Sequence, residues 1–184
     1  MKTRIEKMDS CMNPQTSAEE LIALLQDTDW QIVMAAVVAL GDRKEAKAFP
    51  ALVALLDKED AAPLFSQKED YTLKPAGTSA DGRKRWWLPE DTTHETAMAW
   101  DRRGRLKQSA MFALAAIGLN SEALSQKLQV YAVDQSQDHP VRMAACRTLG
   151  FLKDASACST LEKASTDDEW CTLTEAKKAL ARLN

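Results

Sequence analysis

Apolar residues recur at helical spacing along most of the chain. In the stretch 17–27, Leu21, Leu24 and Leu25 fall on one side of a helix, and three leucines in the stretch 48–57 repeat the pattern. Side chains three and four residues apart share one face of a helix, so this spacing predicts amphipathic helices. We expect four helices of this kind, called A helices below, at residues 17–27, 48–57, 122–132 and 155–164.

A second kind of segment is rich in alanine and repeats along the chain. Residues 30–41 and 139–150 share Met-Ala-Ala and Leu-Gly at the same positions. A third copy ends at Gly118 and a weaker fourth at Ala181, so the last three copies lie one repeat length of 31 or 32 residues apart. The first interval is longer because an insertion at 58–100 interrupts it. Each copy predicts a second helix, called a B helix below, that pairs with an A helix.

Helix pairs of this length bury their apolar faces by stacking on neighbouring pairs. We therefore expect an all-α fold: a single domain that forms a right-handed α-solenoid of about four helix pairs, with a long insertion in the second repeat. The expected repeats span residues 17–45, 46–119 (with the insertion at 58–100), 120–151 and 152–184.

Polar residues mark the expected helix starts. Ser17, followed three residues later by Glu20, predicts a capping box that satisfies free amide groups. Asp29, Asp138 and Asp168 precede three of the expected B helices. A carboxylate in that position can accept hydrogen bonds from the first turn and lies at the positive end of the helix dipole.

The motifs of residues 21–41 carry a family resemblance. Leu-x-x-Leu-Leu, Asp-x-Asp-Trp and Ala-Ala-x-x-Ala-Leu-Gly follow one another there, and the pattern resembles a HEAT-like repeat of the type also found in phycobilisome-lyase-like proteins. The unit at 138–150 matches best, because Arg142 precedes its alanine pair, whereas Val33 stands where the family usually has arginine. The resemblance implies a scaffold whose B helices line an inner, concave surface. Only the family name suggests a lyase that acts on bilin chromophores.

One face of each B helix is left over once its core is assigned. The expected core positions of the first B helix are Ile32, Ala35, Ala36, Ala39 and Leu40. Met34, Val37 and Val38 point roughly the other way, since successive residues turn by about 100°. The expected equivalent positions in later repeats are Met111, Ala115, Met143, Arg147 and Lys178. We take Met34, Val38, Met111, Met143 and Arg147 as candidate partner-binding residues.

This column of methionine and valine has three interpretations. We favour packing between neighbouring repeats. The column would otherwise be an adaptable apolar strip that binds a partner, because flexible thioethers conform to varied surfaces. In the third interpretation the insertion folds back and covers it.

The insertion breaks the repeat rhythm with prolines, glycines and charges. Its candidate binding residues are Arg83, Lys84, Arg85, Trp86, Trp87 and Trp100, followed closely by Arg102 and Arg103. Paired tryptophans usually bury against something, so we favour a staple that holds the insertion on the methionine column. Alternatively the basic residues bind a phosphate or an acidic segment while the rings stack on a base or an apolar anchor. The neighbouring acids Glu90, Asp91, Glu95 and Asp101 argue against nucleic acid.

Composition excludes several classes of activity. The formal net charge of −3 argues against a dedicated nucleic-acid binder. HEAT-like hydroxylases use several His-Glu pairs, but this chain has 2 His, so His94 and Glu95 do not complete such a metal site. The four cysteines form no CxxC pair, and no nucleophile or phosphate-cradling motif occurs. We expect no catalytic residue, no metal and no cofactor.

No stretch approaches the ~20 apolar residues that span a bilayer, and the charged N-terminus lacks the apolar core of a signal peptide. We therefore expect a cytoplasmic protein without a membrane span.

The leading hypothesis is a non-catalytic protein-binding scaffold or adaptor that uses the B-helix face and the Trp-rich insertion. One alternative is a nucleic-acid or phosphate-binding module that uses the basic insertion. The other is a lyase or cofactor-loading accessory protein, by family analogy.

Overall fold

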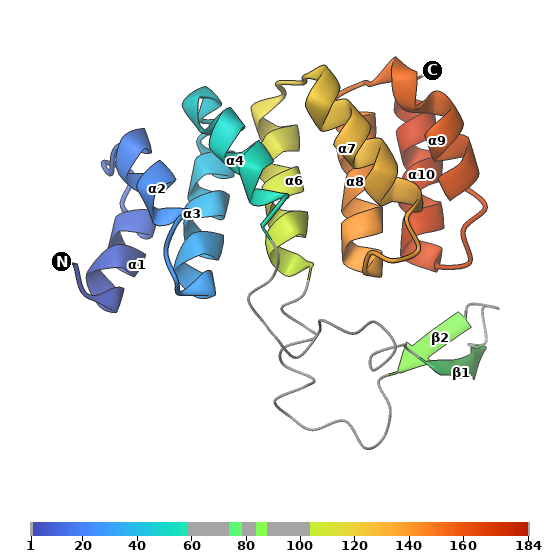
Figure 1. The fold of residues 1–184 in the computed structure, drawn as a ribbon, viewed down its shortest axis with the longest axis horizontal. Coiled ribbons are helices and arrows are strands. Elements are labelled where there is room, and N and C mark those ends of the chain that lie inside the picture. The colour runs from blue at the N-terminus through green and yellow to red at the C-terminus, as the bar shows by residue number, and fades with distance from the viewer. Residues whose placement is uncertain (1, 59–73, 79–83, 88–103, 184) are drawn as a thin grey trace.

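Helices dominate the computed structural model, which describes residues 2–58, 74–78, 84–87 and 104–183. They lie in two rows along the molecule, with the termini at opposite ends (Figure 1). The A row contains α2 (Ala18–Leu24), α4 (Phe49–Leu55), α7 (Glu122–Val133) and α9 (Cys158–Ala164). The B row contains α1 (Arg4–Met12), α3 (Trp30–Asp42), α6 (Arg105–Ile117), α8 (His139–Phe151) and α10 (Trp170–Leu183). The short 3-10 helices η1 (Ala46–Ala48) and η4 (Ala155–Ala157) lead into α4 and α9. The predicted solenoid of helix pairs is confirmed.

The stack of helices continues across the insertion. Helix α6 packs against α3 and α4, although residues 56–104 separate it from α4 in the chain. Within that stretch, β1 (Lys74–Thr78) pairs antiparallel with β2 (Lys84–Trp87). The sequence analysis did not predict this hairpin. The core of the solenoid therefore does not depend on a short connection between α4 and α6.

Leucines of the A helices supply much of the core. Leu21, Leu25, Leu52 and Leu56 have no exposed surface, as the helical spacing predicted. Full burial of such a side chain stabilises a fold by about 1.5–3 kcal/mol. The buried residues form one continuous cluster that runs from Cys11 to the last helix. The repeats thus share a core with their neighbours and none closes a core alone.

Capping residues define the helix starts, with three departures from expectation. The Ser17 hydroxyl accepts a hydrogen bond from the Glu20 amide, but the Glu20 carboxylate accepts a hydrogen bond from Lys2 instead of the Ser17 amide, so the predicted capping box is only half formed. Asp29 caps α3 through the Gln31 amide. Asp138 occupies the N-cap position of α8, but its side chain makes no hydrogen bond to the first turn.

At the start of α10 the cap lies one residue later than predicted. Glu169, rather than Asp168, accepts hydrogen bonds from the amides of Cys171 and Thr172, at 3.0 and 2.7 Å. Glu169 therefore occupies the same position before α10 that Asp29 occupies before α3.

The N-terminal helix α1 extends the B row and was not predicted. Thr3 and Glu6 form a complete capping box at its start, a motif that the sequence analysis recognised elsewhere but not here. Helix α1 packs on α3 and buries Cys11. Its position beside α3 corresponds to that of a B helix in the preceding repeat.

Ion pairs join successive repeats. Arg142 of α8 donates two hydrogen bonds to Asp167 in the turn before α10, at 2.6 and 3.1 Å, and both side chains are almost fully buried. Lys7 of α1 makes the matching contact with Asp27 in the turn before α3, at 2.6 Å. Val33 takes this place in α3, so this ion pair has no counterpart there.

Small residues set the spacing of the B helices. A Cβ atom on Gly41 would lie 2.8 Å from Cβ of Ala113, and one on Gly150 would lie 2.6 Å from Cα of Ala179. Both distances are shorter than real carbon contacts, so only glycine allows this approach. The Leu-Gly motif is therefore a packing motif of the interface between adjacent B helices.

Candidate functional site

The buried positions of the B helices fix their true register. Ile32, Ala36 and Leu40 of α3 are buried at four-residue intervals, and Leu106, Ala110 and Leu114 repeat the series in α6. Val141, Ala145 and Leu149 do so in α8. Phe112, rather than Met111 or Ala115, is therefore the counterpart of Val38 and Arg147.

The predicted place of Met111 on the outward face is wrong, because its side chain is fully buried. The sequence alignment placed Gly118 beside Gly150, but the two glycines differ in structure. Gly150 lies inside α8, whereas Gly118 caps the end of α6 with φ 77°. Val37 is also buried, contrary to expectation, since α3 contacts α1, α2 and α6 and so has a wide buried stripe.

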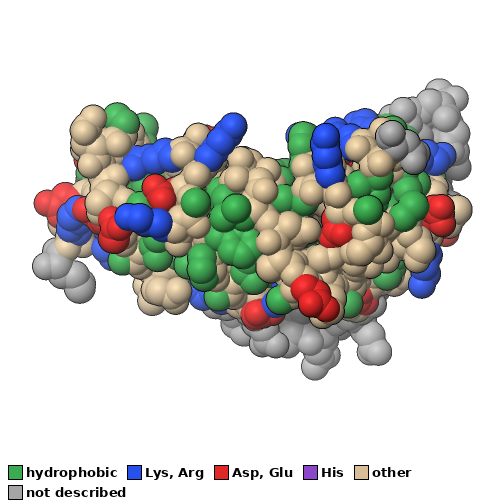
Figure 2. Space-filling model, turned by 90° about the horizontal axis from the view of Figure 1, so that it is seen from above, with side chains coloured by type: hydrophobic (Ala, Val, Ile, Leu, Met, Phe, Trp, Pro, Cys, Tyr) green, Lys and Arg blue, Asp and Glu red, His purple; other side chains and the backbone are tan. Residues whose placement is uncertain are grey.

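An outward face remains along the B row in this corrected register. We call it the B-helix face and define it by Met34, Val38, Phe112, Met143, Arg147, Phe151, Lys178 and Arg182. Val38 and Phe151 are 49% and 48% exposed, which is unusual for large apolar side chains. Met34 and Met143 are half-buried and Arg147 is exposed. Figure 2 shows Lys and Arg side chains projecting along one long edge of the molecule, with hydrophobic side chains exposed nearby.

Aromatic rings and guanidinium groups alternate across three helices of this face. The guanidinium of Arg147 in α8 lies 5.0 Å from the ring centre of Phe112 in α6 and 5.6 Å from that of Phe151. The guanidinium of Arg182 in α10 lies 4.3 Å from the Phe151 ring. Cations over ring faces are attracted by the ring quadrupole. The four side chains, called the Phe-Arg ladder below, are thereby held in one orientation.

The charges of the ladder are not neutralised by carboxylates. Within the described part of the chain, Arg147 makes ring contacts but no hydrogen bond or ion pair, and Nη1 of Arg182 is buried without a hydrogen-bond partner. Lys178 differs, because it pairs with Glu175 at 2.6 Å. Arg147 is exposed and can therefore accept a negatively charged group without breaking an existing ion pair, whereas Arg182 can do so only through the part of its guanidinium that is not buried.

The other predicted site residues are only partly described. Residues 84–87 form β2, so Lys84, Arg85, Trp86 and Trp87 lie on a strand, but the structure does not describe their side chains. Arg83, Trp100, Arg102 and Arg103 lie outside the described residues, as do His94 and Glu95. Their roles stay predictions.

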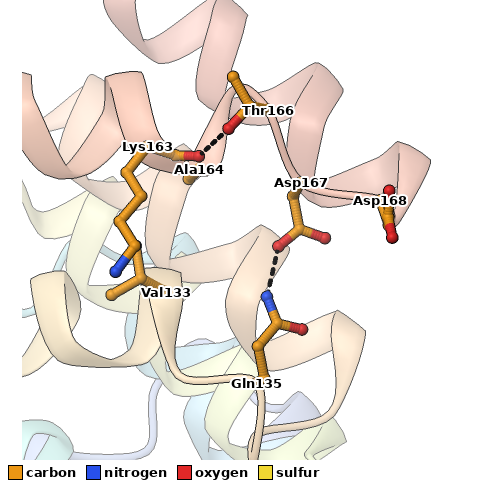
Figure 3. Close-up of a pocket in the computed structure, with 7 residues that line it drawn as sticks. All are labelled: Val133, Gln135, Lys163, Ala164, Thr166, Asp167 and Asp168. Atoms are coloured by element: carbon orange, nitrogen blue, oxygen red, sulfur yellow. Dashed lines mark hydrogen bonds between the residues drawn. The ribbon is translucent and has the colours of Figure 1, made fainter.

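A polar groove of about 360 Å³ lies at the turns of the last two repeats (Figure 3). In it Gln135 donates a hydrogen bond to Asp167 at 2.9 Å, and the Thr166 hydroxyl donates to the carbonyl of Lys163 at 2.8 Å. Asp167 already accepts the Arg142 bonds on its inner side. The polar groups of the groove are used within the fold, which argues against a catalytic or ligand role.

The cysteine Cys146 of α8 is fully buried. Burial raises the pKa of Cys146 to about 12, so its thiol stays protonated at neutral pH. Among the residues that the structure places, no group of three or more His, Cys, Asp or Glu side chains could hold a metal ion.

None of the described helices has both the length and the apolar character that a membrane span requires.

Comparison with known proteins identifies the repeats. A family model described as HEAT repeats matches residues 7–64 and 96–181. One similar solved structure is the complex of CpcE and CpcF of phycocyanin lyase from Nostoc sp. PCC7120, with a TM-score of 0.57 and 23% sequence identity. That likeness covers 93% of this chain and 55% of the other, so the chain spans about half the length of its solved relative.

A designed armadillo repeat protein also aligns, at a TM-score of 0.32 and 18% identity, over 97% of this chain and 87% of the other. No curated protein matches the sequence. The family model accounts for most of the chain, including α1 from Lys7 onward and both sides of the insertion. The chain belongs to the HEAT-repeat family.

Proposed function

We propose that this protein is a non-catalytic scaffold that binds another protein through its B-helix face. The Phe-Arg ladder is the observation that carries the proposal. Aromatic side chains and arginine are enriched in protein interfaces and dominate their energetics. Here Arg147 and Phe151 are exposed and Phe112 and Arg182 are half-buried, on adjacent helices and in a preformed arrangement.

A rigid face lowers the cost of binding. Ordering a rotamer-rich side chain at an interface costs about 0.5–1.5 kcal/mol. Arg147 touches rings on either side and Arg182 lies against Phe151, so much of this ordering precedes any encounter. The glycine contact between α8 and α10 fixes the spacing of the helices that carry them. These features support a binding surface whose side chains are largely ordered before a partner binds.

The Trp-rich insertion is a second proposed contributor. It joins α4 to α6, and α6 carries Phe112 of the ladder. Arg83, Lys84 and Arg85 beside Trp86 and Trp87 combine residue types that anchor protein interfaces. We propose that this segment adds contacts with the same partner.

Capture from a lysate of the source cells tests the scaffold with a matched pair of variants. Val38→Gln alters the B-helix face, whereas Val130→Gln alters a valine of the A helix α7 that is 60% exposed. We expect a reproducible partner that Val38→Gln weakens and Val130→Gln leaves bound. Equal binding by both variants would remove the B-helix face from the proposal. Loss of the partner with the Trp86→Ala, Trp87→Ala double variant would support the role of the insertion.

A cofactor-loading or lyase-like accessory role is the second candidate. Its support is the likeness to the complex of CpcE and CpcF of phycocyanin lyase. The purified protein would be mixed with a bilin, and its visible absorption spectrum compared with that of the free pigment. An unchanged spectrum, with no pigment retained on gel filtration, would count against this role.

A further inference from the structure

The B-helix face changes character along the row of helices. At α3 the outward position carries Val38, and at α6 it carries Phe112. At α8 and α10 the same position carries Arg147 and Lys178, and one turn further on Arg182 follows. The outward position therefore changes from apolar in α3 and α6 to basic in α8 and α10, while the position one turn further on carries Asp42 in α3 and the exposed Phe151 in α8.

The basic end lacks the acidic groups that would satisfy it. Glu175 is engaged by Lys178, and Asp42 lies on α3, at the apolar end of the row. Neither Arg147 nor Arg182 has a carboxylate within ion-pair distance in the described residues. Guanidinium groups match carboxylates through paired, charge-assisted hydrogen bonds. A partner protein can supply the carboxylates that would pair with Arg147 and Arg182.

A protein segment fits this face better than a nucleic acid. Nucleic-acid binders typically neutralise about 6–10 phosphates, whereas the basic end offers two unpaired arginines and one paired lysine. The exposed apolar surface of Val38 would gain nothing from a phosphate backbone. The whole chain carries a formal charge of −3, which adds a weak repulsion.

The spacing of the helices limits the shape of the segment. Packed helices lie about 8–10 Å apart, and an extended chain in the polyproline II conformation rises about 3.1 Å per residue with three residues per turn. A segment in that conformation that crosses the B row therefore turns every third side chain toward the face and moves from one helix to the next about every three residues. Acidic side chains at that interval would meet Arg147 and Arg182 in turn, after an apolar side chain has met Val38.

We propose that the B-helix face binds an extended, acidic segment of a partner protein, with an apolar residue on Val38 and Phe112 and carboxylates on Arg147 and Arg182. This inference rests on the proposed scaffold function and names the chemistry of its partner. The Phe-Arg ladder then serves as the specificity element, because it positions both guanidinium groups before the partner arrives.

Selection from a phage-displayed library of random 12-residue peptides tests this chemistry directly. The full chain is the bait, in parallel with the Arg147→Gln, Arg182→Gln variant. The matched control is the Lys163→Gln, Lys177→Gln variant, which removes the same charge from two exposed lysines off the ladder. Circular dichroism melts establish that the three baits are equally folded.

The expected result is enrichment of Glu and Asp downstream of an apolar residue with the wild-type and lysine-variant baits. That enrichment should disappear with the arginine variant. Each arginine should account for about a tenfold loss in affinity for a selected peptide. The Arg147→Lys, Arg182→Lys variant should retain a preference for acids but bind more weakly, since lysine loses the planar fork.

Other outcomes separate this inference from the scaffold proposal. Peptides that are apolar without acidic enrichment, and that Val38→Gln weakens, would overturn the acidic partner while leaving the face as a binding surface. Tighter binding of a single-stranded dT oligonucleotide than of any selected peptide, with a steep loss at higher salt, would overturn the inference in favour of nucleic acid. Absence of any selected peptide, together with the absence of a partner in lysate, would overturn both proposals.

Discussion

At the scale of single residues, the ion pair between Arg142 and Asp167 shows how strongly one contact can tie two repeats. The pair is buried and bidentate, and Asp167 also accepts a hydrogen bond from the Glu169 amide. Replacement of Arg142 by methionine would leave the Asp167 carboxylate buried without its charge partner. We expect Arg142→Met to lower the free energy of unfolding by about 3 kcal/mol, measured by urea denaturation.

An exposed ion pair provides the control for this prediction. Lys47 and Glu19 lie 2.9 Å apart with both side chains well exposed, so Lys47→Met should leave stability unchanged within error. The Arg142→Met, Asp167→Asn double variant should lose less than the sum of its single variants, because neither partner is left charged and alone. Additive effects would mean that the two residues act independently.

The buried thiol of Cys146 makes a pH-dependent prediction. Burial raises its pKa from the ordinary 9.0 to about 12, so the unfolded chain loses this proton at lower pH than the folded protein. The unfolded state then binds fewer protons between about pH 9 and pH 12, and stability falls as pH rises through that window. Cys146→Ala should make the loss of melting temperature between pH 8 and pH 10 smaller than in the wild type.

Thiol labelling with an aromatic disulfide at pH 8 checks the same environment independently. Exposed Cys158 should react fast in the folded protein, whereas Cys11 and Cys146 should react only after unfolding. Rapid labelling of Cys146 in the native state would contradict the buried position.

At the scale of helices, two glycines of the B row are needed for different reasons. Gly150 is needed because there is no space for a side chain, and Gly118 because of its backbone conformation. Gly150→Ala places a Cβ atom 2.6 Å from the backbone of Ala179, so α8 and α10 must move apart. We expect a loss of about 2 kcal/mol, although alanine is the better helix former by roughly 1 kcal/mol. Gly118 has open space but a φ of 77°, so Gly118→Asn should be tolerated better than Gly118→Val. Urea denaturation of the variants measures both effects.

Helix α1 should behave as a packed member of the B row. The hydrogen bond from Lys7 lowers the pKa of Asp27, so this contact stabilises the fold above about pH 4 and is lost as the carboxylate protonates. We expect Lys7→Met to reduce stability by about 1 kcal/mol at pH 7. The variant should also lose less stability than the wild type between pH 5 and pH 3. Chemical denaturation at the three pH values tests both statements, and an unchanged acid dependence would show that α1 is only loosely attached.

Sequence periodicity predicted the helix pairs well but misplaced one register. The leucine spacing around Leu21 and Leu52 reports burial directly, so those helices were found. In α6 the motif Leu-Gly is absent, and aligning Gly118 with Gly150 shifted the outward position from Phe112 to Met111. Glycine occurs both as the residue that ends a helix and as a packing residue inside one. The sequence does not separate the two roles, whereas the backbone conformation and the packing distances do. That shift hid Phe112 of the Phe-Arg ladder, whereas Phe151 and Arg182 were missed because the sequence analysis did not follow the outward face one turn beyond Arg147 and Lys178.

At the scale of the whole molecule, the family and the solenoid followed from the repeat, whereas α1 and the hairpin did not. The short helix α1 is polar on average and lies outside the repeat that the sequence analysis followed, so its place became clear only from its packing on α3. The pairing of β1 and β2 lies in a segment outside the repeat pattern. The repeat pattern predicts the helices that belong to it, but it gives no information about α1, which precedes the repeats, or about the hairpin that interrupts them.

The continuity of the stack across the insertion leads to a final prediction. Residues 56–104 separate α4 from α6, whereas residues 134–138 join α7 to α8, a roughly tenfold shorter connection. Because α6 packs directly on α3 and α4, replacing residues 59–103 by a short A-to-B turn should leave the solenoid folded. Loop-closure entropy grows with loop length, so the shortened protein should gain up to about 2 kcal/mol, seen as a higher melting temperature. A large loss of stability would instead show that the tryptophans staple the insertion to the helices, and retention of partner binding would move the whole binding function onto the B-helix face.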